Sequence, residues 1–221
     1  MNKPLASTIT VTGAALSALL VVSLAAQSVD RLAGKNVSIA AVTFKGRSAI
    51  QVIASPDAAN ASSYAVVKDA SFRDGTIEVE LAGQPAAGAG AGARGFIGIA
   101  FRIQGDGRYE YIYLRPTNGR ADDQLRRNHS TQYSSFPGFD FAKSRQEAPE
   151  KYESYVDLEP GVWSRYKIEV DGRKARLYVQ GAAQPCLIVN DLKLEPQAGG
   201  VALWVGPGTE GYFANLTITG R

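Results

Sequence analysis

The stretch Thr76-Ile-Glu-Val-Glu-Leu81 alternates apolar and acidic residues without a break. Successive side chains of a β-strand point to opposite faces, so Ile77, Val79 and Leu81 share one face. Glu78 and Glu80 take the other. This period of two is typical of a strand that packs one face on a hydrophobic core and turns the other to water.

The same period recurs on both sides of this stretch and predicts strands over the ranges 37–44, 49–54, 96–103, 108–115, 163–170, 175–179, 201–205 and 212–219. Asp171-Gly172 separates two of these ranges, and both residue types tolerate the positive φ of a tight hairpin turn. No range has the pattern of a long amphipathic helix. Many short strands joined by turns predict an all-β protein with two packed antiparallel sheets.

The first residues have a different character. Lys3 precedes an uncharged, mostly apolar run over 11–24, and Ser23 and Ala25 are small residues at the positions that a signal peptidase requires. We therefore predict a signal peptide over 1–25, a single sandwich domain over 26–221 and export to the bacterial periplasm or the extracellular space. An uncleaved membrane anchor is the alternative, although the run is short for a span.

Charge and cysteine content restrict the function classes. The formal net charge is +3, and removal of the leader takes Lys3 with it, so the mature chain is nearly neutral. This balance argues against nucleic acid as a partner, because such binding requires a basic face. No membrane span is expected after signal cleavage. Cys186 is the single cysteine and lies in an apolar run, which predicts a buried, inert thiol and excludes an intrachain disulfide.

Two stretches interrupt the strand pattern. Residues 86–95 are nearly all Ala and Gly, which predicts a flexible hairpin loop. Residues 116–151 are polar, lack periodicity and are long for a connection, and such loops in compact domains are usually functional or disordered. This second stretch carries several aromatic residues, which argues against disorder and makes it the candidate site.

The strand that precedes this stretch carries an aromatic face. Tyr109, Tyr111, Tyr113 and Arg115 alternate along it and share one side. Such a face suits a neutral polyhydroxylated ligand, because rings pack on the apolar faces of a sugar and planar polar groups bond its hydroxyls. If the preceding strand lies alongside, its small residues leave room above the sheet and Arg102 borders that space. The alternative is that these tyrosines are half-buried sheet packing.

The predicted ligand-binding set extends from this face into the polar stretch, and comprises Arg102, Tyr109, Tyr111, Tyr113, Arg115, Asn118, Arg126, Arg127, Asn128, Gln132 and Tyr133. His129, the single histidine, is the candidate general acid or base. The alternative for 126–129 is an exposed polar loop. Many carboxylate pairs could serve glycoside hydrolysis, and the sequence does not select one. No metal-ligating spacing, phosphate loop or nucleophile elbow is present.

Several segments, taken together, resemble the concanavalin A-like lectin/glucanase superfamily, notably 72–81, 95–102, 109–116, 163–172, 175–179, 200–206 and 212–216. Within it, the chain is similar to laminin-G-like domains and to the bacterial family named for 3-keto-disaccharide hydrolases. The resemblance implies an antiparallel two-sheet jelly-roll sandwich whose concave sheet binds or cleaves carbohydrate. Some members bind calcium, so a structural calcium ion is compatible with it, and no other cofactor is expected. The Glu-x-Asp-x-x-Glu strand of family-sixteen glucanases is absent.

Three hypotheses follow. The first is an exported lectin-like module that recognises a glycan on the Tyr and Arg face. The second is a hydrolase acting on glycosides, including 3-keto glycosides, with His129 in an acid–base role. The third is a protein-interaction or cell-surface structural module, since a fold does not fix a function. The sequence leaves the glycan, any metal and the oligomeric state open.

Overall fold

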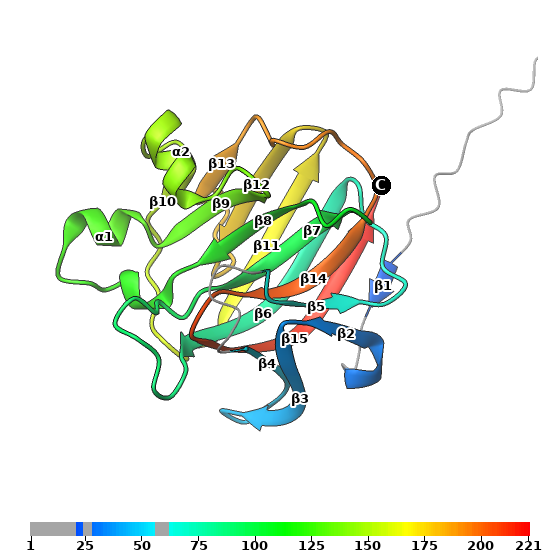
Figure 1. The fold of residues 1–221 in the computed structure, drawn as a ribbon, viewed down its shortest axis with the longest axis horizontal. Coiled ribbons are helices and arrows are strands. Elements are labelled where there is room, and N and C mark those ends of the chain that lie inside the picture. Colours follow the sequence, from blue (N-terminus) through cyan, green and yellow to red (C-terminus); the bar gives the residue numbers. More distant parts are fainter. Residues whose placement is uncertain (1–20, 24–27, 56–61) are drawn as a thin grey trace, which may run out of the picture.

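The computed structural model describes residues 21–23, 28–55 and 62–221, and within these residues two antiparallel sheets face each other (Figure 1). The first sheet runs in the order β13 (Leu187–Val189), β12 (Lys174–Val179), β11 (Ser164–Asp171), β6 (Gly75–Pro85), β15 (Thr209–Gly220), β4 (Arg47–Ala54) and β3 (Val37–Phe44). The second runs β10 (Glu153–Ser154), β9 (Thr131–Phe136), β8 (Tyr109–Leu114), β7 (Ile97–Ile103), β14 (Gly200–Val205), β5 (Tyr64–Val67) and β2 (Leu32–Lys35). The predicted jelly-roll sandwich is confirmed.

The core lies between the two sheets. Ile77, Val79 and Leu81 of β6 are buried as their alternation predicts, and they face a layer from the second sheet that includes Ile99 and Ile112. The β11–β12 hairpin also forms as predicted, with Asp171 paired to Lys174 and Gly172 at a φ of 55°. Cys186 packs against this core, and burial raises the pKa of its thiol to about 11.

Most of the predicted signal peptide lies outside the described residues. The exception is β1 (Val21–Ser23), whose backbone pairs with the end of β15. The short 3₁₀ turn η1 (Val29–Arg31) then leads into β2. No helix in the described part of the chain is long and apolar enough to cross a membrane.

The polar stretch over 116–151 is more ordered than a loop. It contains the 3₁₀ turn η2 (Pro116–Asn118), the short helices α1 (Gln124–Asn128) and α2 (Phe141–Glu147), and between them the strand β9. Asp123 and Asp140 cap the two helices by accepting hydrogen bonds from Arg126 N and Lys143 N. Both helices lie beyond β9, at one end of the sandwich (Figure 1). The two helices border the outer face of the second sheet at that end.

Candidate functional site

The outer face of the second sheet carries an aromatic floor. Tyr109, Tyr111 and Tyr113 of β8 lie on it together, as the alternation predicts, and Trp204 of β14 joins them from two strands away. The ring centroids of Trp204 lie 5.0 Å from Tyr111 and 4.9 Å from Tyr113. The four rings thus form one continuous surface.

Gly98 of β7 makes this contact feasible. It pairs with Tyr113 on one side and with Trp204 on the other, so the two rings meet above a residue that has no side chain. A Cβ at this position would lie 2.1 Å from the carbonyl oxygen of Ile112. The strand order, which places β7 between β8 and β14, therefore brings the tryptophan to the tyrosines.

A pocket of about 570 Å³ opens above this floor. Seven aromatic side chains line it, namely Phe96, Tyr109, Tyr111, Tyr113, Phe136, Phe141 and Trp204. Gly90, Gly92 and Ala93 of the Ala/Gly loop form another part of the wall, so this loop borders the site. Two hydroxyls are held by protein groups, because Tyr109 Oη contacts Ser62 Oγ at 2.9 Å and Tyr113 Oη contacts Gln132 Oε1 at 3.0 Å. We call this the aromatic pocket.

A second pocket of about 540 Å³ adjoins the first and shares Gly92, Phe96 and Phe141 with it. Its charged and polar lining comprises Arg94, Arg115, Asn118, Asp123, Arg126, His129 and Arg145. Four of these residues, Arg115, Asn118, Arg126 and His129, belong to the set predicted from sequence. We call this the arginine pocket.

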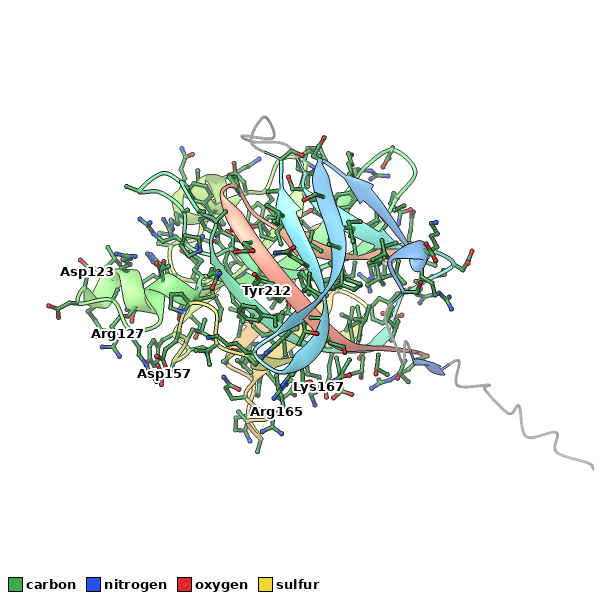
Figure 2. All side chains as sticks on the ribbon, turned by 90° about the horizontal axis from the view of Figure 1, so that it is seen from below. Asp123, Arg127, Asp157, Arg165, Lys167 and Tyr212 are labelled. Atoms are coloured by element: carbon green, nitrogen blue, oxygen red, sulfur yellow. The ribbon has the colours of Figure 1, made fainter. Side chains whose placement is uncertain are left out.

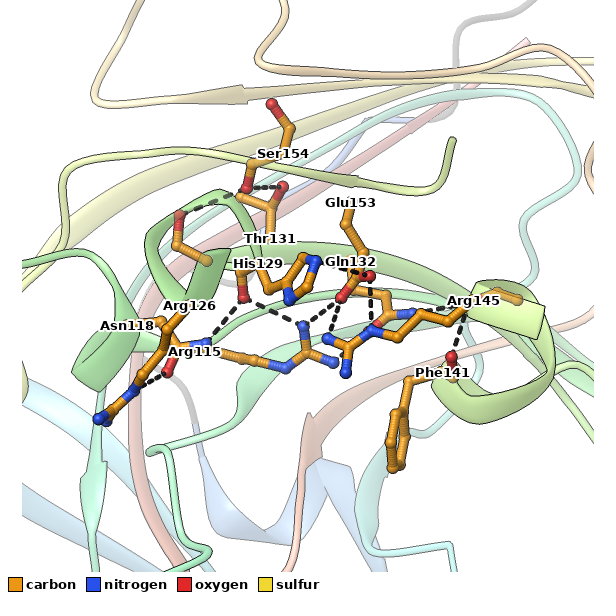
Figure 3. A network of polar contacts seen from close by, with 12 residues as sticks. Arg115, Asn118, Arg126, His129, Thr131, Gln132, Phe141, Arg145, Glu153 and Ser154 are labelled. Carbon is orange, nitrogen blue, oxygen red and sulfur yellow. Dashed lines mark hydrogen bonds and ion pairs between the residues drawn. The ribbon is translucent and has the colours of Figure 1, made fainter. Parts of the chain in front are cut away.

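Glu153 of β10 binds two arginines that line the arginine pocket, Arg115 and Arg145 (Figure 3). Its carboxylate accepts hydrogen bonds from Arg115 Nη1 at 2.8 Å and from Arg145 Nε and Nη2 at 2.8 and 2.6 Å. The Glu153 and Arg115 side chains are 2% and 5% exposed, whereas Arg145 is 38% exposed. Arg115 also donates to Tyr113 Oη, His129 O and Gln132 Oε1. This network anchors the tyrosine floor to β9, β10 and α2.

The ionisation of Glu153 makes the stability of this network depend on pH. Burial by itself would raise the pKa of its carboxyl, but hydrogen bonds from Arg145 and Arg115 outweigh burial and hold the pKa below the ordinary value of 4.5. A carboxyl with a lowered pKa in the folded state stabilises the fold at neutral pH, and that contribution is lost as the pH falls through the lowered value.

We therefore expect the free energy of unfolding to decrease as the pH falls below about 4.5. Glu153→Gln should be less stable at neutral pH and show a shallower decrease over the same range, because it removes the titrating group. Urea denaturation of both proteins between neutral and acid pH measures this. Glu195→Gln, at an exposed carboxylate paired with Arg173, is the control and should follow the parent protein. Parallel curves for the parent and Glu153→Gln would contradict the assignment.

His129 lies at the edge of the same network. Its Nε2 is 3.5 Å from Glu153 Oε2, and its backbone carbonyl accepts hydrogen bonds from Arg115 and Asn118. Burial lowers the pKa of the imidazole below its ordinary 6.5, with Glu153 acting in the opposite direction. The ring is therefore neutral at pH 7 and faces a carboxylate that two arginines already bind.

Arg102 does not border the face, contrary to the sequence prediction. Two residues of β7, Phe101 and Arg102, stand opposite one residue of β14, and this bulge places Arg102 at a φ of 54°. Its side chain is 1% exposed and bonds Asp74 Oδ1 at 2.9 Å and the carbonyl oxygens of Arg73 and Gly172. The assumption of uninterrupted alternation is what failed.

Four other predicted residues also line neither the aromatic pocket nor the arginine pocket. Tyr133 points into the core, where its hydroxyl donates to Glu110 Oε2 at 2.6 Å. Gln132 shares the face with Tyr113 but is fully buried, with its amide nitrogen bonded to Ser144 of α2. Arg127 reaches Tyr155 on the outer surface (Figure 2), and Asn128 accepts a hydrogen bond from Gln124 within α1.

Sequence reasoning missed Trp204, Phe96, Arg94 and Glu153 as parts of the site. Trp204 and Phe96 lie in or beside predicted strands, so correct strand pairing would have found them. Arg94 follows the Ala/Gly loop directly, and Glu153 was one of many acidic residues without a distinguishing pattern. Within the described ranges, no group of three or more His, Cys, Asp or Glu side chains is positioned to hold a metal ion.

No family model and no curated protein matches this sequence. Solved structures are similar to it in fold. The carbohydrate-binding module CBM66 from Bacillus subtilis has a TM-score of 0.55 at 16% identity and covers 84% of this chain and 93% of its own. The exoplasmic/lumenal domain of VIP36, bound to Ca²⁺ and Man3GlcNAc, has a TM-score of 0.53 at 9% identity and covers 90% and 87%. A native glycosidic hydrolase has a TM-score of 0.52 at 10% identity and covers 93% and 97%. These likenesses confirm the antiparallel two-sheet jelly-roll fold.

Proposed function

We propose that this protein is a carbohydrate-binding module that holds its ligand in the aromatic pocket. The observation that carries the proposal is the Tyr111–Trp204 surface at the base of an open pocket of about 570 Å³. Sugar rings present apolar C–H faces that pack on aromatic rings, and ligand pockets are typically apolar with a few fixed polar groups. Two proteins of similar fold are a carbohydrate-binding module and a lumenal domain bound to Man3GlcNAc, which supports the same class of ligand.

The burial of the individual rings distinguishes those that hold the floor in place from those that can contact the ligand. Tyr109 and Tyr113 are 2% and 4% exposed and their hydroxyls bond to protein groups, so they hold the floor in place. Tyr111 is only partly buried and stacks on its neighbours from the centre of the floor. We therefore assign Tyr111 to ligand contact, and Tyr109 and Tyr113 to positioning. Trp204 is 8% exposed, and we assign it to ligand contact because it lines the pocket beside Tyr111.

Export belongs to the same proposal. The run over 11–24, with small residues at the cleavage position, supports a signal peptide over 1–25. N-terminal sequencing of protein recovered outside the cytoplasm tests the cleavage position, and an intact first residue in a cell-surface fraction would instead indicate the anchor.

Tyr111→Ala is expected to weaken glycan binding by about tenfold, because it removes one stacking ring from the floor. A glycan array of the residues 26–221 protein selects the ligand, and titration calorimetry of parent and variant measures the change in dissociation constant. Tyr178→Ala is the matched control, since Tyr178 lies on β12 in the opposite sheet and bonds Glu169 there. Equal losses in both variants would count against the aromatic pocket as the site.

A glycoside hydrolase is the second candidate. The observation that favours it is that His129, which lines the arginine pocket, approaches the buried carboxylate of Glu153. The carboxylates that line the two pockets are Asp140 and Asp123, and both cap helices. Sugar release from every array hit, 3-keto glycosides included, distinguishes hydrolysis from binding. Release that survives His129→Ala would remove this histidine from the mechanism, and silence with all glycans would favour a protein partner.

A further inference from the structure

The arginine pocket carries more positive charge than its own carboxylates balance. Arg115 and Arg145 share Glu153, while Arg94 and Arg126 form no ion pair with any residue in the described ranges. Asp123 is the other carboxylate at the pocket and is occupied by the backbone N–H of Arg126 at the start of α1. The pocket thus combines four guanidinium groups with two carboxylates, and His129 is neutral at pH 7. Its net charge is therefore +2.

Arg94 and Arg126 also retain unused donors. Arg94 Nη1 donates to the carbonyl oxygens of Ala91 and Ala93 at 2.6 and 3.0 Å, which fixes the side chain while its Nε and Nη2 bond to no described residue. Arg126 Nε donates to Asn118 Oδ1 at 3.0 Å and its Nη2 to Thr117, which leaves Nη1 without a described partner. Held guanidinium groups with free N–H donors match the oxygens of a carboxylate or sulfate.

The arginines also repel one another. Burial lowers the pKa of Arg94, and the charges of Arg126 and Arg115 lower it further. Like charges held this close destabilise each other until a counter-charge enters. A bound anion would relieve that repulsion.

The two pockets are continuous, because Phe96 and Phe141 line both. We propose that the ligand is an anionic oligosaccharide, with a sugar ring in the aromatic pocket and a carboxylate or sulfate group in the arginine pocket. This rests on the proposed carbohydrate-binding function and narrows it from the neutral ligand that the sequence suggested to an acidic one. Uronic acids and sulfated sugars share this chemistry.

The test compares matched ligands. Oligouronides are titrated into the protein beside the same oligosaccharides after chemical reduction of their carboxyl groups, which removes the charge and keeps the stereochemistry. Sulfated oligosaccharides and their desulfated forms make a second pair. We expect the anionic member of at least one pair to bind at least tenfold more tightly, and that preference to shrink as NaCl rises from about 0.05 M to about 0.5 M.

Arg94→Gln and Arg126→Gln should each reduce the affinity for the anionic member by roughly tenfold and reduce the affinity for the neutral member by less, so that the preference for the anion shrinks. Arg165→Gln is the control. Arg165 is exposed on the first sheet (Figure 2), so this substitution removes the same charge far from the pocket. An equal loss in Arg165→Gln would show a non-specific charge effect and overturn the assignment of the arginine pocket.

The outcomes separate the two proposals. Equal binding of the charged and neutral members, with loss in Tyr111→Ala, would overturn the anionic ligand and keep the carbohydrate-binding function. Binding of inorganic sulfate alone, without any glycan, would overturn the continuous site. The absence of binding to every glycan in either charge state would reject the carbohydrate-binding function itself.

Discussion

Trp204→Ala is expected to weaken glycan binding by about a hundredfold, the largest functional effect that we predict for a single substitution. Trp204 contacts both Tyr111 and Tyr113 and closes the floor on the β14 side. Its removal deletes the broadest ring from the pocket and lets the two tyrosines relax into the space. Titration calorimetry with the best glycan of the array measures the loss.

Two variants show whether this loss is specific to ligand contact. Trp204→Phe keeps an aromatic ring on the floor and should remain within about tenfold of the parent. Trp163→Ala removes the other tryptophan, which packs edge-on against Phe44 on the outer surface of the first sheet, beside Tyr212 (Figure 2). It should bind like the parent. Circular dichroism confirms that each variant is folded, and full affinity in a folded Trp204→Ala protein would place the ligand elsewhere.

Arg115→Ala is expected to lower the free energy of unfolding by about 3–5 kcal/mol, because it breaks a buried ion pair. Glu153, 2% exposed, would keep Arg145 as its cationic partner, and the acceptors Gln132 Oε1 and His129 O would each lose one of two donors. Arg145→Ala should cost at most about 1 kcal/mol, because Arg145 is 38% exposed and its pairing is screened by water. Urea denaturation at pH 7 measures both variants.

A double variant tests the physical cause. Replacing both members of a buried pair with apolar residues is often near neutral, so Arg115→Met combined with Glu153→Leu should be more stable than Arg115→Ala alone. If the double variant is instead destabilised by the sum of the two single changes, the pair is not the source of the effect. Loss of glycan binding in Arg115→Ala therefore cannot by itself identify Arg115 as a ligand contact.

The strands that could be predicted from sequence are those whose residue types alternate between the two faces. β6, β11 and part of β15 place one face on the core and the other toward water, so their sequences alternate and were predicted. β7 and β8 are buried on both faces, but the residue types on the two faces differ, so these strands were predicted as well. β5 is apolar on both faces and shows no alternation. β9 is polar although it is almost wholly buried, because its side chains hydrogen-bond to α2, β8 and β10. Alternation in sequence records a difference between the two faces of a strand, and neither β5 nor β9 has that difference.

The candidate site was predictable to the same extent. The tyrosines of β8 follow from alternation along one strand, whereas Trp204 reaches them through the pairing of β7 with β14. That pairing is non-local and leaves no mark in the sequence of either strand. Arg102 was misplaced because a single bulge reverses the side to which a residue points. The ion pairs of Glu153 likewise depend on where β10 and α2 meet.

The Ala/Gly loop has a consequence for how this binding site can change over evolution. Gly90 and Gly92 line the aromatic pocket, and a Cβ added at either would meet no atom within 4 Å. New side chains at these two positions would enter free space beside the ligand without displacing the sheet beneath. Ligand preference can therefore diversify through this wall while the aromatic floor and the folding core stay constant. A library randomised at positions 90 and 92 would be a direct route to variants with altered glycan selectivity.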